Sequence, residues 1–112
     1  MTTLVAIQDM MFMSKVDVTA AQLGVSVVRA RRGASLVEEI RRTGATRVLL
    51  DLAAVGVDAV REVRADLALK DVILLGYCRH TAEALIAQAH AAGCSEVLTQ
   101  GEFSARLARL LR

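Results

Sequence analysis

The feature of this sequence that most constrains its fold is a series of short apolar runs, each followed by a longer segment with helical spacing. The five runs cover residues 4–7, 25–28, 47–52, 72–75 and 96–98. They do not alternate between apolar and polar residues, which is typical of strands that are covered on both faces. The pattern therefore predicts a parallel sheet between two layers of helices.

The segments between these runs carry the signals of helices. Apolar residues recur on one helical face within residues 11–23, 57–67, 81–92 and 104–111. In segment 57–67, the predicted buried face consists of Val57, Val60, Val63 and Leu67. Another helix is predicted to begin at a capping-box pattern, Ser35 with Glu38, and to end at Gly44.

Five strands that alternate with five helices define an α/β fold. Right-handed crossovers and the chain length favour a flavodoxin-like, three-layer (βα)5 architecture, in which the five parallel strands have the order 2-1-3-4-5. The 112 residues are enough for one hydrophobic core and not for two. We therefore expect a single domain over residues 1–112.

Composition excludes several classes of protein. An apolar content of 54% with a net charge of +2 argues against a disordered chain and gives no reason to predict nucleic-acid binding. No apolar stretch is long enough to span a bilayer, and no secretory signal opens the sequence, so we expect a cytoplasmic protein without a membrane partner. Cys78 and Cys94 are accordingly expected to be reduced thiols in or near the core.

Polar side chains follow the first and third predicted strands, where a parallel sheet of this order places its ligand site. Gln8 and Asp9 follow the first strand, and Asp51 ends the third. If Asp9 and Asp51 face one crevice, they could share a divalent cation such as Mg²⁺. The alternative is that each acid caps the loop or helix that follows its strand, and the same alternative holds for Asp58 further along.

Several of these residues also match a known family. The match rests on segments 48–51, 64–66 and 91–98, together with Asp58 and Phe103. The first of these segments ends at Asp51. On these residues the chain resembles the response-regulator receiver domain over nearly its whole length. The resemblance implies that Asp51 occupies the position of the phosphoacceptor, and that Asp9 and Asp51 occupy metal-binding positions.

The departures from the receiver pattern concern the residues that act on the phosphoryl group. Receivers have an acidic pair where this chain has Gln8 and Asp9, and a Thr or Ser near the position that we assign to Cys78. They end the fifth strand with Lys-Pro, where Gln100 and Gly101 stand here, and this chain has no proline at all. These losses predict a degenerate pseudo-receiver that requires no cofactor and binds Mg²⁺ only weakly.

Other residues near the same edge could still contact a ligand. Lys15, beside Ser14 in the predicted first helix, could replace the missing lysine by facing Asp51, or it could be a solvated helix residue. His80 follows the fourth strand and is either a ligand contact or an ordinary surface residue. Together with Gln8, these side chains give the alternative of a small-molecule or anion sensor.

The function expected from the sequence is that of a stand-alone signalling protein, not an enzyme, that binds another signalling protein. The resemblance implies a possible homodimer through segments 81–92, 96–98 and 104–111. One or two of the four residues 10–13 should be exposed and available to a partner. A genuine phosphoacceptor at Asp51 with Mg²⁺ remains the main alternative. Five arginines around the second helix are expected to be solvated: Arg29, Arg31, Arg32, Arg41 and Arg42.

Overall fold

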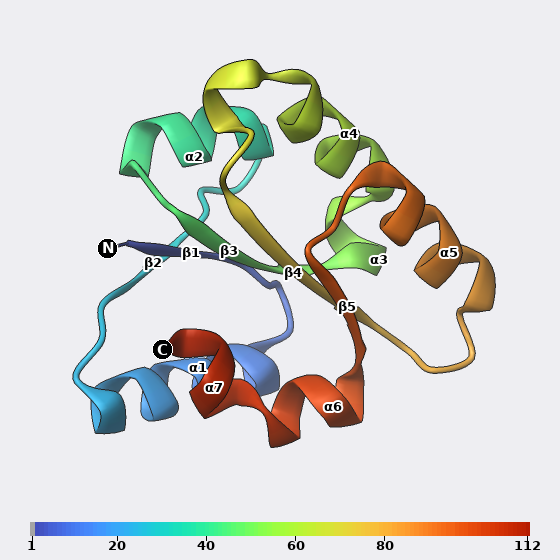
Figure 1. The fold of residues 1–112 in the computed structure, drawn as a ribbon. Coiled ribbons are helices and arrows are strands. Elements are labelled where there is room, and N and C mark those ends of the chain that lie inside the picture. Colours follow the sequence, from blue (N-terminus) through green and yellow to red (C-terminus); the bar gives the residue numbers. More distant parts are fainter. Residues whose placement is uncertain (1) are drawn as a thin grey trace.

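A computed structural model describes residues 2–112 and contains the predicted parallel sheet. The strands are β1 (Thr3–Ala6), β2 (Val27–Arg29), β3 (Arg47–Asp51), β4 (Ile73–Cys78) and β5 (Glu96–Thr99). Every pair of neighbouring strands is parallel, and the strand order is β2-β1-β3-β4-β5 (Figure 1). The structure thus confirms the fold and strand order expected from the sequence.

Helices cover both faces of the sheet. One face carries α1 (Met10–Leu23), α6 (Gln100–Ala105) and α7 (Leu107–Leu111) (Figure 1). The other carries α2 (Leu36–Thr43), α3 (Leu52–Val55), α4 (Val57–Ala65), α5 (Glu83–Ala92) and the short 3-10 helix η1 (Leu67–Leu69). None of the helices within residues 2–112 is long and apolar enough to cross a membrane.

Two hydrophobic clusters, one on each face of the sheet, explain why the strands are apolar throughout. Alternate strand residues enter different clusters because successive side chains point to opposite faces. The side chains that point toward α2, α4 and α5 are those of Leu4, Val48, Leu50 and Leu74. Those that point toward α1, α6 and α7 belong to Val5, Leu49, Leu75 and Tyr77. Both thiols are free, with Cys78 buried and Cys94 partly buried against the first cluster, as expected.

The structure corrects the predicted extent of the helix that begins at Val57. This helix, α4, ends at Ala65, and the Asp66 carboxylate accepts a hydrogen bond from the Ala68 backbone N–H to begin η1. Leu67 is therefore 82% exposed instead of lying on the buried face with Val57, Val60 and Val63. A local cap has overridden the helical periodicity at this point.

The capping box forms at a different helix from the one predicted. Ser35 Oγ accepts a hydrogen bond from the Glu38 N–H, but the return bond from the Glu38 side chain is not among those of the described residues. A reciprocal box instead starts α6, where Thr99 Oγ1 accepts from the Glu102 N–H and Glu102 Oε1 accepts from the Thr99 N–H. The predicted helix 104–111 is also interrupted at Arg106, where α6 ends.

Candidate functional site

The candidate site begins with Asp51, the last residue of β3. Asp51 is aligned with Tyr77 of β4 in the strand register. Register partners in neighbouring parallel strands point to the same face, and Tyr77 belongs to the cluster under α1, α6 and α7. The Asp51 side chain therefore lies at the carboxyl edge of the sheet on the α1 side.

Both acids predicted to share a cation serve as helix caps. Asp51 Oδ1 accepts a hydrogen bond from the Ala53 N–H at 3.1 Å and starts α3. Asp9 Oδ1 accepts from the N–H groups of Met11 and Phe12 at 2.8 and 3.1 Å and starts α1. The capping alternative thus describes both Asp9 and Asp51. It does not describe Asp58, because Asp58 lies inside the first turn of α4 and pairs with Arg61 at 2.5 Å.

The negative charges of both acids affect the hydroxyl group of Tyr77. Its side chain is 1% exposed, and its hydroxyl has no hydrogen-bond partner among the described residues. Burial raises the pKa of this hydroxyl, and the negative charges of Asp51 and Asp9 raise it further. The charges of both carboxylates therefore disfavour ionisation of the same buried hydroxyl.

An aromatic cluster packs beside Asp51, on the side of the sheet that carries α1 and α6. It consists of all three aromatic residues of the chain, Phe12, Tyr77 and Phe103. The Tyr77 ring centroid lies 4.9 Å from that of Phe12 and 4.5 Å from that of Phe103, and the two phenylalanine centroids are 5.9 Å apart. These separations are typical of packed aromatic pairs. The cluster joins β4 to α1 and α6 directly beside Asp51.

The register aligns Tyr77, and not Cys78, with Asp51. Cys78, to which we assigned that position, packs in the cluster under α2, α4 and α5. Burial raises the pKa of its thiol, as does the charge of Asp51 to a smaller extent. Cys78 therefore lies on the opposite face from the Asp51 side chain, and Tyr77 is the β4 residue aligned with Asp51.

Within residues 2–112, the Lys15 ammonium makes no ion pair with Asp51 and binds Ser104 instead. Lys15 Nζ donates a hydrogen bond to Ser104 Oγ at 2.9 Å and lies 6.0 Å from the centroid of the Phe12 ring. It thereby links α1 to α6, so the predicted contact with Asp51 is replaced by a contact between helices. The remaining predicted ligand contacts, Gln8, Ser14 and His80, are all exposed, and so is Gln100, which stands at the position of the receiver lysine in the predicted pattern.

The residues at this edge do not suit the Mg²⁺ that receivers bind. Nowhere in residues 2–112 do three or more His, Cys, Asp or Glu side chains converge on a possible metal position. One oxygen of Asp9 and one of Asp51 already accept backbone hydrogen bonds, and Gln8 supplies no charge. Since Mg²⁺ needs near-octahedral oxygen ligands and favours carboxylates, two partly engaged acids are a poor donor set.

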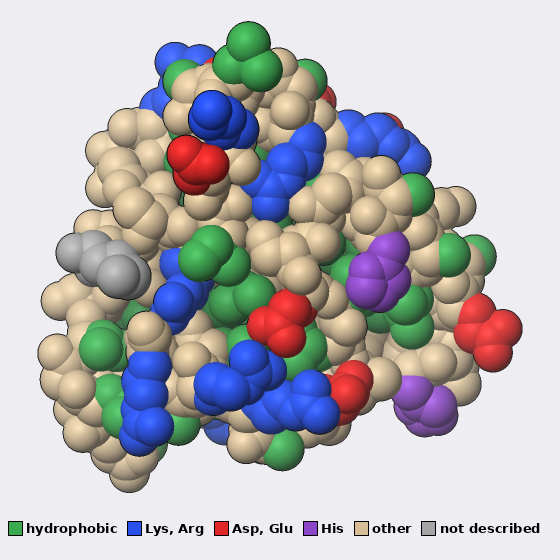
Figure 2. Space-filling model, in the orientation of Figure 1, with side chains coloured by type: hydrophobic (Ala, Val, Ile, Leu, Met, Phe, Trp, Pro, Cys, Tyr) green, Lys and Arg blue, Asp and Glu red, His purple; other side chains and the backbone are tan. Residues whose placement is uncertain are grey.

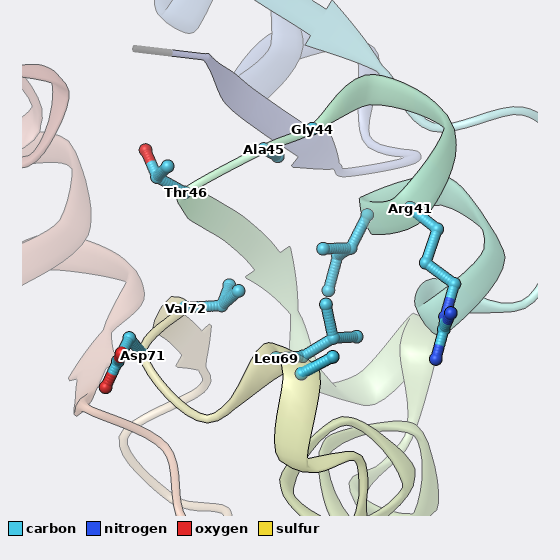
Figure 3. A pocket seen from close by; sticks show the side chains of 9 residues that line it. Arg41, Gly44, Ala45, Thr46, Leu69, Asp71 and Val72 are labelled. Atoms are coloured by element: carbon cyan, nitrogen blue, oxygen red, sulfur yellow. The ribbon is translucent and has the colours of Figure 1, made fainter.

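A cavity lies at the opposite edge of the sheet from Asp51, where the strands begin. It has a volume of about 330 Å³ and lies between the end of α2 and η1. The side chains of Leu69 and Val72 point into it, whereas the charged ends of Arg41 and Asp71 lie at its rim (Figure 3). This arrangement provides no nucleophile or acid-base pair inside the cavity.

A buried carboxylate fixes the loop after β2. Glu39 is fully buried, and its two oxygens accept hydrogen bonds from the Arg31 backbone N–H, from Arg31 Nε and from the Arg42 guanidinium. Two of the five arginines that were expected to be solvated therefore clamp one acid. The bonds from Arg42, followed by those from Arg31, lower the pKa of Glu39 to about 2.

This lowered pKa predicts an acid-dependent loss of stability. A carboxyl group with a lower pKa in the folded state stabilises the fold above its unfolded pKa, here 4.5, and loses that contribution as the pH falls toward about 2. We expect Glu39→Gln to unfold more easily at neutral pH and to have a flatter pH dependence of unfolding between pH 4.5 and 2. Urea unfolding at several pH values measures this, and an unchanged slope in the variant would contradict the assignment.

Comparisons with known proteins agree with this fold. No protein-family model and no curated protein matches the sequence. Among solved structures, a response-regulator receiver domain from Bermanella marisrubri is similar with a TM-score of 0.78 and 17% identity, covering 99% of this chain and 98% of that one. A response regulator from Burkholderia multivorans has a TM-score of 0.75 and 22% identity, with 97% and 90% covered.

A response regulator from Thermotoga maritima is also similar, with a TM-score of 0.76 and 16% identity, covering 96% of this chain and 91% of that chain. The chain therefore has the receiver-domain fold over nearly its whole length. The resemblance inferred from segments 48–51 and 91–98 is confirmed at the level of the fold.

Proposed function

We propose that this chain is a receiver-like signalling protein that acts by binding another protein, without phosphorylation of Asp51. The receiver fold supports the signalling role. The observation that carries the finer proposal is the surroundings of Asp51: the carboxylate caps α3, and its β4 neighbour is the buried Tyr77.

Phosphoryl transfer depends on positioning and on neutralising the charge of the transferred group. Near Asp51, the acid set is reduced to Asp9, and the neutral Gln100 follows β5. The one lysine near this edge, Lys15, is engaged with Ser104. If each lost charge removes a few kcal/mol of transition-state stabilisation, as single oxyanion donors do, transfer to Asp51 becomes very slow.

Beryllofluoride with Mg²⁺ tests this proposal by mimicking a bound phosphoryl group. We expect no saturable shift of the Ala53 backbone amide in NMR spectra, because no cation site forms beside Asp51. A saturable, Mg²⁺-dependent shift at Ala53 that disappears in Asp51→Asn would show that the chain is a genuine phosphoacceptor. The Asp51→Asn variant is the matched control, since an asparagine oxygen can still cap α3.

The partner surface that we propose for a second copy of the chain consists of α5, β5 and α7. Three small residues, Ala84, Ala87 and Ala91, are exposed on α5, and Arg109 of α7 pairs with Glu96 of β5 at 3.4 Å. Figure 2 shows this side of the molecule, with small hydrophobic patches over α5 and charged side chains gathered over α6 and α7. Such a mixed surface suits a reversible homodimer.

Sedimentation equilibrium tests this surface with Ala87→Arg. We expect the wild-type chain to dimerise and the variant to be monomeric, because a long charged side chain prevents close approach of the two α5 helices. Val18→Arg, which changes an exposed residue of α1, is the control and should dimerise as the wild type does. A dimer that persists in Ala87→Arg would place the interface elsewhere.

A further inference from the structure

A groove at the carboxyl edge of the sheet carries chemistry that the Asp51 site does not use. It has a volume of about 610 Å³, within the range of small-molecule sites. It lies between α2 and α4, beyond the ends of β1 and β2, and its apolar lining includes Val5, Ala30, Val55 and Ala59. This is the edge at which parallel α/β sheets bind their ligands.

One wall of the groove is basic and held in place. The loop after β2 supplies Arg31 and Arg32, and the buried Glu39 anchors this loop through the Arg31 backbone and guanidinium. Glu39 is shared by Arg31 and Arg42, so two positive charges face one negative charge. Arg32 is exposed and makes no ion pair among the described residues. The wall therefore combines one arginine that Glu39 holds in place, Arg31, with a second, exposed arginine, Arg32, whose charge no described residue neutralises.

The acids around the groove offset this charge only in part. On the opposite wall, Asp58 is paired with Arg61. The other acid of this wall, Glu62, makes no ion pair with any residue of the range 2–112. The helix α2 also begins at the groove, with Ser35 and Leu36 in its lining. The positive end of a helix dipole adds to the attraction that the arginines exert on an anion.

The rest of the lining limits the ligand further. No aromatic side chain lines the groove, so it offers no surface on which a nucleotide base or flavin ring can stack. Its apolar side chains are small and aliphatic, and the Met10 side chain, 85% exposed, lies at its rim. An aliphatic body fits this lining, with its acidic group directed to the arginine wall.

We propose that this groove binds a small anionic ligand with an aliphatic body, whose acid group contacts Arg31 and Arg32 while the body lies against Val55 and Ala59. Such a ligand would occupy the groove between α2 and α4 and hold these two helices in one arrangement. The site uses none of the atoms of Asp9, Asp51 or Tyr77, so it works whether or not Asp51 accepts a phosphoryl group.

Titration with hexyl phosphate, followed by backbone amide shifts in NMR spectra, tests the proposal. We expect saturable shifts at Ala30, Arg32 and Ala59, with affinity higher than that of inorganic phosphate or of hexanol alone. Arg32→Glu should weaken binding roughly tenfold or more, as the loss of one charge-assisted contact does. Ala59→Phe should also weaken it, because the larger side chain fills the groove.

Arg79→Glu is the matched control, since Arg79 is exposed at the same edge of the sheet but does not line the groove. It should bind hexyl phosphate as the wild type does, and so should Asp51→Asn, which separates this site from the Asp51 site. The proposal is overturned if no saturable shift is seen, if inorganic phosphate binds equally well, or if Arg32→Glu and Ala59→Phe both bind normally.

Discussion

Arg64→Met is expected to lower the free energy of unfolding by about 3 kcal/mol, since hydrogen bonds from a charged donor contribute about 1.5–3 kcal/mol each and are not additive. The Arg64 guanidinium donates to the carbonyl oxygens of Gly93 and Val72 at 2.8 Å, and to Lys70 O and Ser95 Oγ at 3.2 Å. One side chain thus joins α4 to the start of β4 and to the turn between α5 and β5.

The control for this variant is Arg61→Met on the same helix. Arg61 is exposed and pairs only with Asp58 among the described residues, so we expect a change below about 1 kcal/mol, the usual limit for a surface ion pair. Urea denaturation followed by circular dichroism measures both variants. Equal losses in the two variants would show that the four contacts of Arg64 add no stability beyond those of a surface arginine.

Phe103→Ala is expected to cost about 3–5 kcal/mol, the usual range for removing a buried aromatic side chain. Phe103 is fully buried and packs on Tyr77 with a centroid separation of 4.5 Å. Its loss leaves a cavity under the Tyr77 ring, next to Asp51, and removes the contact that seats α6 on β4.

Phe103→Leu separates packing from aromatic contact. We expect this variant to lose less than half as much stability as Phe103→Ala, because most of the buried volume is kept. Thermal and urea unfolding of both variants provide the measurement. If Phe103→Ala were as stable as the wild type, the aromatic cluster would not be the packing centre beside Asp51.

The sheet could be predicted from the sequence because the apolar pattern of each strand by itself indicates that both faces of that strand are buried. A run such as 47–52 is apolar on both faces, and two helical layers are the way to bury such a strand. The error at Leu67 has the opposite origin. Periodicity continued through this residue, but the Asp66 carboxylate ends α4 by capping η1, and a side-chain cap competes with a helix wherever both can form.

The position of the candidate site and the capping role of its acids could be predicted from the sequence, but its other contacts could not. The strand ends located Asp9 and Asp51 at one edge, because parallel strands bring their carboxyl ends together. Which β4 residue stands beside Asp51 depends on the register of β3 with β4, which pairs Asp51 with Tyr77. A shift of one residue exchanges the two faces, so Cys78 and Tyr77 could not be distinguished without the register.

The contacts of long side chains could not be predicted from the sequence either. Lys15 and Ser104 are 89 residues apart, and only the packing of α1 against α6 brings them together. The same holds for Glu39, whose fully buried position follows from the path of the loop after β2. A Ser–Lys pair or a Glu among arginines gives no signal in sequence that distinguishes these contacts from a solvated surface.

The most direct test of a phosphorylation-independent receiver is the intact mass of the protein after incubation with acetyl phosphate and Mg²⁺. We predict that the mass stays unchanged, because Asp51 caps α3 beside the buried Tyr77 and the acids described at this edge are a poor set of Mg²⁺ ligands. An increase by one phosphoryl group in the wild type that is absent from Asp51→Asn would contradict this prediction and show that Asp51 is a working phosphoacceptor.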